Sequence, residues 1–126
     1  MKNIKEKVLY SFLFFLFVLV DQLTKYYFSD HSFRNYFFAF SLHIPIWLMY
    51  AIYAILLGGL LYWFIVATKK TVWTKLAFVL IVAGAISNLV ERIALGYVRD
   101  FIYIHTGVFN LADFMIILGL IILFFI

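Results

Sequence analysis

Long apolar runs separated by short polar or basic segments divide the chain into four parts. The runs are Val8 to Val20, Ile44 to Ala67, Val72 to Leu95 and Asn110 to Ile126. A helix rises about 1.5 Å per residue and needs about 20 residues to cross a hydrocarbon core of about 30 Å. The pattern therefore predicts four transmembrane helices, of which the last is barely long enough to cross.

The first run is short and follows a basic start, as in a secretory signal peptide. The segment after it, Asp21 to Tyr27, contains no small-x-small cleavage site. We therefore interpret this run as a retained first helix that ends near Phe28.

Composition supports a membrane protein. Hydrophobic residues make up 67% of the 126 residues and charged residues 13%, whereas soluble domains are roughly 45 to 50% apolar and about 25% charged. We expect an all-α integral membrane protein in which residues 1–126 form a single domain. Because the chain has no cysteine, it holds no disulfide, thiolate nucleophile or zinc-thiolate site.

Lysines cluster before the first span and between the second and third spans. They are Lys2, Lys5, Lys7, Lys69, Lys70 and Lys75. Positive residues favour the cytoplasmic side, so we expect both termini in the cytoplasm and the connectors 29–43 and 96–109 on the outer face. Their aromatic and β-branched residues predict extended segments at the membrane interface. We interpret the net charge of +4 as a topology signal and expect no nucleic-acid partner.

Several polar side chains fall within the predicted spans, where each is costly unless it is paired or faces water. Counted along the helices, Asp21, Asn88, Glu91, Arg92 and Asp113 lie at one level, about 18 to 24 Å from the cytoplasmic edge. This agreement predicts one shared polar site beneath the outer surface. On the third span, Asn88 and Arg92 are four residues apart and share one face.

The same residues also allow purely structural roles. Asp21 with Lys25, and Glu91 with Arg92, can pair within one helix. Asn110 and Asp113 can cap the last helix as a variant of the capping box. The residues alone leave these interpretations open beside a functional site.

Asp100 and Asp113 are separated by 12 residues. If that segment folds back, the two carboxylates can share one proton. The charged group then activates water and the protonated group polarises an amide carbonyl. The helix dipole makes Asp113 the expected base.

Other hydrolytic sites have less support. The three histidines lack metal-ligand spacing, so no metal site is expected. Ser87 with His105, or Ser29 with Lys25, supplies a nucleophile and a base, but neither pair stands in a supporting motif.

Five sequence blocks occur in a recognisable order. They are DQLTK at Asp21 to Lys25, Arg34-Asn35 ahead of Ala39 to Ser41, GAISNLVER at Gly84 to Arg92, GYVRDFI at Gly96 to Ile102, and FNLAD at Phe109 to Asp113. Together they resemble the motifs of the lipoprotein signal peptidase (signal peptidase II) family. The resemblance implies a bacterial inner-membrane aspartic peptidase with four transmembrane helices and a small extracytoplasmic β-cradle. It also implies removal of the signal peptide from diacylglyceryl-modified prolipoproteins, with cleavage before the lipidated cysteine.

The resemblance also implies roles for single residues. It assigns Asp100 and Asp113 to the catalytic dyad. The substrate-binding residues it implies are Asn35, Asn88, Arg92 and Asn110, and the supporting polar pair is Asp21 with Lys25. It implies no cofactor or metal, and a diacylated prolipoprotein and membrane lipid as partners. We expect a monomer whose site lies near the outer face.

Four positions differ from the family pattern. Phe37 and Phe38 stand where small residues are usual, Ser87 replaces a glycine and Glu91 replaces an aspartate. We expect these differences to bear on substrate preference.

Two other functions remain open from the sequence. One is a degenerate homologue that binds prolipoproteins or an antibiotic without cutting. The other is a small transporter or channel subunit in which Asp21, Glu91 and Arg92 form a relay. Retention of both aspartates favours the enzyme.

Overall fold

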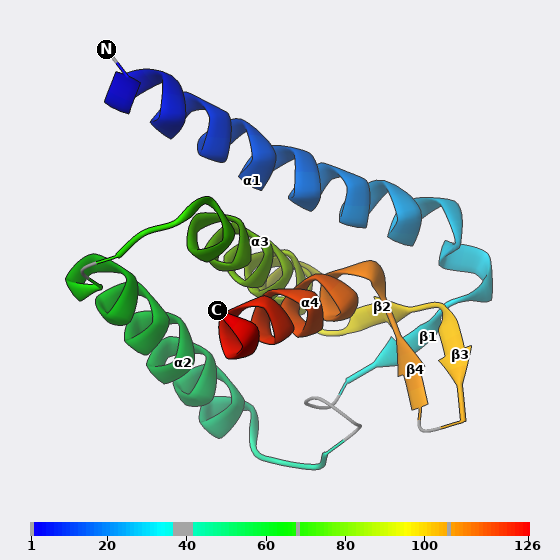
Figure 1. Ribbon diagram of the computed structural model, residues 1–126. Helices are drawn as coiled ribbons and strands as arrows, with labels where there is room; N and C mark the ends of the chain where they lie inside the picture. Colours follow the sequence, from blue (N-terminus) through cyan, green and yellow to red (C-terminus); the bar gives the residue numbers. More distant parts are fainter. Residues whose placement is uncertain (1, 37–41, 68, 106) are drawn as a thin grey trace.

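The computed structural model describes residues 2–36, 42–67, 69–105 and 107–126. Its elements are, in order, α1 (Lys2–Tyr27), η1 (Ser29–His31), β1 (Phe33–Asn35), α2 (Ile46–Val66), α3 (Val72–Leu95), β2 (Val98–Asp100), β3 (Ile102–Ile104), β4 (Gly107–Phe109) and α4 (Leu111–Phe125). The strands lie together at one end of the helices (Figure 1). The prediction of a four-helix membrane protein is confirmed. Within these described residues, three helices are long and apolar enough to cross a membrane, and α4 is shorter, with 15 residues.

Local signals set the ends of the helices. Thr71 caps α3 by accepting the N–H of Thr74 at 3.2 Å. Gly96 ends α3 at a φ of 82°, a left-handed conformation that glycine adopts without steric cost. The second helix begins at Ile46 rather than at the predicted Ile44, because Pro45 has a ψ of 144° and lies outside the helix.

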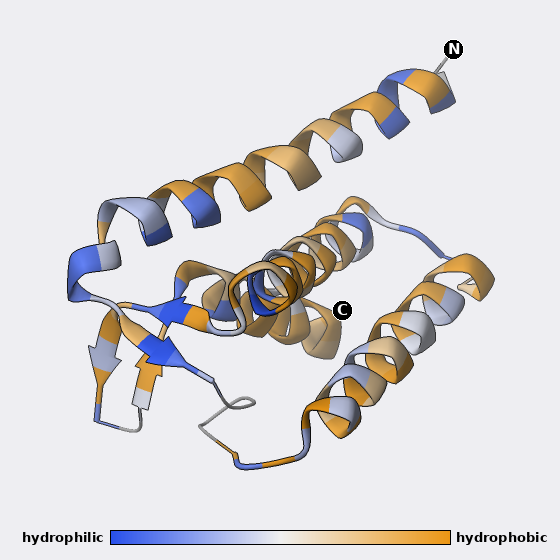
Figure 2. Cartoon of the chain, turned by 180° about the vertical axis from the view of Figure 1, so that it is seen from behind, coloured by the Kyte–Doolittle hydropathy of each residue, from blue (hydrophilic) through white to orange (hydrophobic). Residues whose placement is uncertain are grey.

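The third helix, α3, is the centre of the bundle. It contributes most of the buried residues, whereas Met49 is the buried residue of α2. Its strongest packing is against α4, followed by α1. Figure 2 shows apolar residues along most of the length of the helices, and the most hydrophilic residues mainly near helix ends and on strands. This distribution matches helices surrounded by lipid.

Two antiparallel strand pairs form the end of the molecule that holds the site. β1 pairs with β2, with Phe33 opposite Asp100, and β3 pairs with β4, with Ile102 opposite Phe109. The extended connectors are thus confirmed for these strands. Residues 29–31 form a 3-10 turn instead, closed by the N–H of Ser32 donating to the carbonyl of Ser29 at 3.2 Å.

The β3–β4 hairpin has a direct consequence for the predicted dyad. It carries the chain away from Asp100 and returns it to Asn110, the N-cap of α4. The segment between the two aspartates therefore folds back, as the dyad hypothesis requires.

Candidate active site

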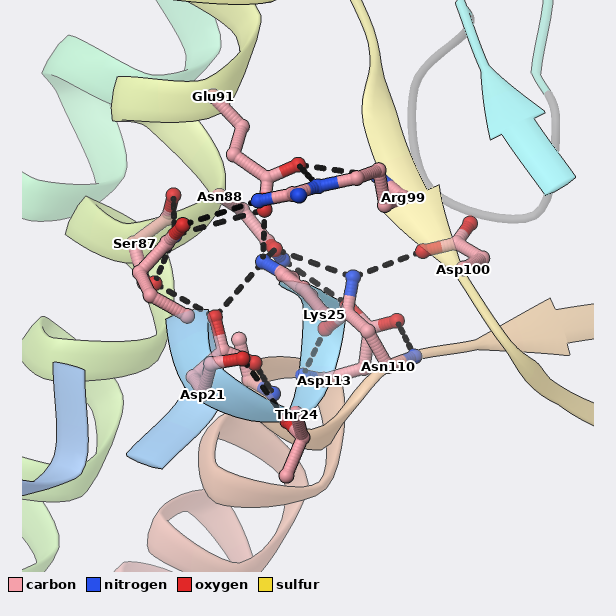
Figure 3. A network of polar contacts seen from close by, with 12 residues as sticks. Asp21, Thr24, Lys25, Ser87, Asn88, Glu91, Arg99, Asp100, Asn110 and Asp113 are labelled. Carbon is pink, nitrogen blue, oxygen red and sulfur yellow. Dashed lines mark hydrogen bonds and ion pairs between the residues drawn. The ribbon is translucent and has the colours of Figure 1, made fainter. Parts of the chain in front are cut away.

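Polar side chains from α1, α3, β2 and the start of α4 meet in one network (Figure 3). The residues predicted as dyad and substrate-binding groups also line one cavity of about 680 Å³. These are Asn35, Asn88, Arg92, Asp100, Asn110 and Asp113. Asp21 and Lys25, the supporting pair, do not line this cavity but belong to the network, in which Lys25 donates to Asn88.

Asp100 stands at the end of β2, with only 2% of its surface exposed. Its carboxylate accepts the side-chain N–H of Asn110 at 2.7 Å and that of Asn35 at 3.2 Å. Burial raises the pKa of Asp100 to about 6, and the nearby charge of Asp113 adds to the rise. Proton retention at moderately acidic pH makes Asp100 suited to be the protonated member of a carboxyl pair.

Asp113 lies in the first turn of α4. One of its oxygens accepts the backbone N–H of Asn110 at 3.0 Å, and Asn110 accepts the backbone N–H of Asp113 at 3.0 Å. This is the predicted capping box. The other oxygen accepts the side-chain N–H of Asn88 at 3.0 Å. Capping and membership of the carboxyl pair are therefore compatible, because the cap fixes Asp113 at the cavity.

Asn110 and Asn88 connect the two carboxylates to the rest of the network. The Asn110 amide nitrogen donates to Asp100 and also to Asn88 Oδ1, the latter at 3.1 Å. Lys25 Nζ donates to the same Asn88 oxygen at 2.8 Å. This orients Asn88 so that its N–H faces Asp113.

The predicted pair of Asp21 and Lys25 forms within α1. Lys25 Nζ lies 2.7 Å from an oxygen of Asp21, and both side chains are fully buried. The other Asp21 oxygen accepts the backbone N–H of Ala112 at 2.8 Å. The pair therefore ties α1 to the first turn of α4, which carries Asp113.

The alternative pairing of Glu91 with Arg92 is wrong. Glu91 lies 3.0 Å from Lys25 Nζ and 3.3 Å from Arg99 Nε. Arg92 Nη1 instead donates to the hydroxyl of Tyr53 on α2 at 2.8 Å. Adjacent residues of a helix point about 100° apart, so Glu91 faces α1 and Arg92 faces the cavity.

Three residues of the site had no role predicted from the sequence. Tyr53 lines the cavity beside Arg92. Arg99 donates to Glu91 and, at 3.3 Å, to Gln22. Gln22 donates to the hydroxyl of Ser87 at 2.8 Å. The signal available for Tyr53 was its polar hydroxyl within an apolar span; Gln22 and Arg99 stand inside the recognised blocks.

Two positions that differ from the family pattern enter this network. The Ser87 hydroxyl donates to Asp21 at 2.5 Å, and Glu91 joins Lys25 to Arg99. Phe37 and Phe38 lie outside the described residues.

The rival hydrolytic pairs do not form. The Ser87 hydroxyl binds Asp21, and His105 is an exposed residue of the β3–β4 turn. Lys25 Nζ points to Asp21, Glu91 and Asn88 rather than to Ser29. Across the described residues, no group of three or more histidine or acidic side chains is placed to hold a metal ion.

Comparisons with known proteins give consistent matches. A family model described as signal peptidase (SPase) II matches residues 13–126. A lipoprotein signal peptidase of Pseudoalteromonas translucida is 45% identical over 87 residues, 63% of this chain and 51% of that protein. One from Streptococcus pyogenes serotype M6 is 28% identical over 139 residues, 94% of this chain and 91% of that protein. The matched segment thus spans about half of the first relative and nearly all of the second.

A solved structure gives the same fold. It is described as a bacterial membrane enzyme, and it superposes with a TM-score of 0.79 at 25% sequence identity. The match covers 92% of this chain and 85% of the other.

Proposed function

Because this chain belongs to the signal peptidase II family, we propose that it is an intramembrane aspartic endopeptidase. The proposed reaction removes the signal peptide from diacylglyceryl-modified prolipoproteins and cuts before the lipidated cysteine. The observation that carries the proposal is that Asp100 and Asp113 line one cavity and are joined through Asn110.

The chemistry follows from two carboxyl groups with one proton between them. Asp113 takes a proton from a water molecule as its oxygen attacks the scissile carbonyl carbon, and protonated Asp100 donates to the carbonyl oxygen. The tetrahedral intermediate collapses when Asp113 passes its proton to the leaving nitrogen and the C–N bond breaks. Asp100 takes its proton back from the intermediate's hydroxyl as the carbonyl group re-forms, which restores the starting state of the pair. The proton assignments belong to the pair and exchange over the cycle. This mechanism needs no metal or cofactor.

The other polar residues of the cavity bind the substrate or hold the two aspartates in place. Arg92 presents a planar fork of donors for the backbone carbonyls near the scissile bond. The hydroxyl of Tyr53 holds this guanidinium from α2. Asn35 and Asn110 hold Asp100 by hydrogen bonds, and Asn88 holds Asp113. Lys25 fixes Asn88 by a hydrogen bond, and Asp21 fixes the start of α4 by accepting the backbone N–H of Ala112.

The walls of the cavity suit an apolar substrate. Residues of α2, α3 and α4 such as Leu56, Ala85 and Ile117 line it beside the polar groups. We infer that the signal helix and the acyl chains of the substrate lie against these walls, in contact with membrane lipid. The whole unit, residues 1–126, works as a monomer with both termini in the cytoplasm and the dyad near the outer face.

The contacts give less support to a transporter. A relay through Asp21, Glu91 and Arg92 needs a continuous polar path. Glu91 points to Lys25 and Arg99, whereas Arg92 contacts Tyr53 in the cavity. A homologue that binds prolipoproteins without cutting stays an alternative, and the following experiment decides it.

The test is cleavage of a diacylated prolipoprotein by the purified protein, followed by gel shift. Asp100→Asn and Asp113→Asn should each lower the rate by about 10² or more, because an amide cannot hold the shared proton state. Asp30→Asn is the matched control, since Asp30 is an exposed acid of η1 outside the network. No cleavage by the unsubstituted protein, or full activity in either dyad variant, contradicts the proposal.

A further inference from the structure

A second cavity, of about 610 Å³, lies between α1, α2 and α3. Its lining comes from the start of α1, the end of α2 and the start of α3, at the end of the molecule away from the strands (Figure 1). Phe14, Phe64, Phe78 and Val82 contribute to its apolar walls. It shares no lining residue with the cavity that holds Asp100 and Asp113.

Three lysines from three separate elements border this cavity. Lys7 belongs to α1, Lys70 to the connection between α2 and α3, and Lys75 to α3. The acidic residue in the lining is Glu6, which forms an ion pair with Lys75. Three lysines and one glutamate leave the border with a net positive charge.

Aromatic rings keep two of these lysines over the cavity. Lys70 Nζ lies 4.9 Å from the ring centre of Phe64, and Lys75 Nζ lies 5.9 Å from that of Tyr10. Such cation–π contacts are favourable and hold the ammonium groups against the apolar wall. The cavity is therefore apolar within and cationic at its border.

We propose that this cavity binds an anionic phospholipid. An acyl chain fills the space between the phenylalanines, and the headgroup phosphate lies among Lys7, Lys70 and Lys75. A hollow that opens between membrane-spanning helices is surrounded by acyl chains, and basic pockets at the ends of such helices select anionic headgroups. The amino-terminal region of a signal peptide is itself basic, so the same lysines would repel it.

This inference does not rest on the peptidase activity. The test measures binding of phosphatidylglycerol and phosphatidylcholine by native mass spectrometry, with melting temperature as a second readout. The cavity variant combines Lys7→Gln with Lys70→Gln. The matched control combines Lys5→Gln with Lys69→Gln, which removes the same charge from exposed neighbours outside the lining.

Phosphatidylglycerol should bind the unsubstituted protein and the control equally well, and the cavity variant about tenfold more weakly. All three proteins should melt alike in phosphatidylcholine, which shows that they are folded. If the double variant fails to fold, Lys7→Gln against Lys5→Gln gives the same comparison with a smaller loss.

Three results would overturn the proposal. They are equal binding of the two lipids, equal losses in the cavity variant and the control, and stabilisation by water-soluble glycerol phosphate alone. A fourth result, displacement of the lipid by a basic signal-peptide fragment, would also overturn it, because the cavity would then belong to the substrate.

Discussion

Asn110 performs three tasks with one side chain. Its oxygen caps α4, and its amide nitrogen donates to both Asp100 and Asn88. The N-cap residue of α4 therefore also joins the two carboxylates. A buried amide with its donors and acceptor in use keeps one orientation, because rotation would leave polar atoms unpaired.

Asp100 gives a prediction for stability against pH. Its pKa rises from 3.8 to about 6 on folding, so between these values the folded protein keeps a proton that the unfolded chain has released. Stability should therefore fall as pH rises through this window and level off above it, a loss of about 2 to 3 kcal/mol. Asp100→Asn removes this titration. The melting temperature of the variant minus that of the unsubstituted protein should therefore be larger at pH 8 than at pH 4.

Asp30→Asn serves again as the control for the pH experiment. Its difference in melting temperature from the unsubstituted protein should be much smaller and should change little between the two pH values. An Asp100→Asn difference that stays constant from pH 4 to pH 8 would mean that Asp100 titrates normally.

Residue roles were predictable from the sequence where they depend on local spacing. The capping box of Asn110 and Asp113 and the pairing of Asp21 with Lys25 follow from separations of three and four residues, and both form. The partners of Glu91 depend on how α3 is rotated against α1. No local pattern fixes that rotation, so the sequence left a pair of Glu91 with its neighbour Arg92 open as an alternative to a place in the shared polar site.

At the scale of elements, glycine allows the close approach of α3 and α4. A Cβ on Gly84 would lie 2.5 Å from the carbonyl oxygen of Ala112 and 2.8 Å from Ile116 Cγ1. Further along, a Cβ on Gly119 would lie 2.5 Å from Ile81 Cγ1. Small residues bring membrane helices together in this way. The contact at Ala112 is one residue before Asp113, so this packing also positions the site.

Gly84→Ala should therefore reduce both stability and cleavage. The added methyl has no room, and overpacking of this kind costs about 1 to 3 kcal/mol. It should also push the first turn of α4, and with it Asp113, away from Asn88. Melting temperature and cleavage rate are the two measurements.

Gly58→Ala on α2 is the matched control for the change at Gly84. An added Cβ there meets nothing within 4 Å, so the variant should melt no lower than the unsubstituted protein. If Gly84→Ala and Gly58→Ala have the same melting temperature and cleavage rate, the contact between α3 and α4 can accommodate a methyl group at Gly84, and the prediction is wrong.

For the whole molecule, the hydrophobic pattern was sufficient to predict four helices, since length and apolar content decide that arrangement. The depth count placed the polar residues of separate spans at one level. The structure joins Asp21, Asn88, Glu91 and Asp113 in one network (Figure 3), whereas Arg92 lines the cavity and contacts Tyr53. The depth count could not show that Tyr53 of α2 also lines the cavity. That contact depends on the tilt of α2, which lipid-facing residues do not specify.

The proposed orientation gives a labelling prediction. The chain has no cysteine, so one introduced cysteine reports one position. His105→Cys, at the exposed β3–β4 turn, should react with a membrane-impermeant maleimide on intact spheroplasts. Lys69→Cys, between α2 and α3, should react only after the membrane is opened. The reverse pattern would place the dyad on the cytoplasmic side.

The ion pair inside α1 bears on the order in which the protein assembles during synthesis. Asp21 and Lys25 are four residues apart on the helix that is made first. They can neutralise each other before α3 has left the ribosome, so α1 can enter the bilayer with the two charges near its carboxyl end matched. Glu91 enters later, together with Arg99 as its own partner. The contact of Lys25 with Glu91 then joins these two ion pairs in the finished bundle.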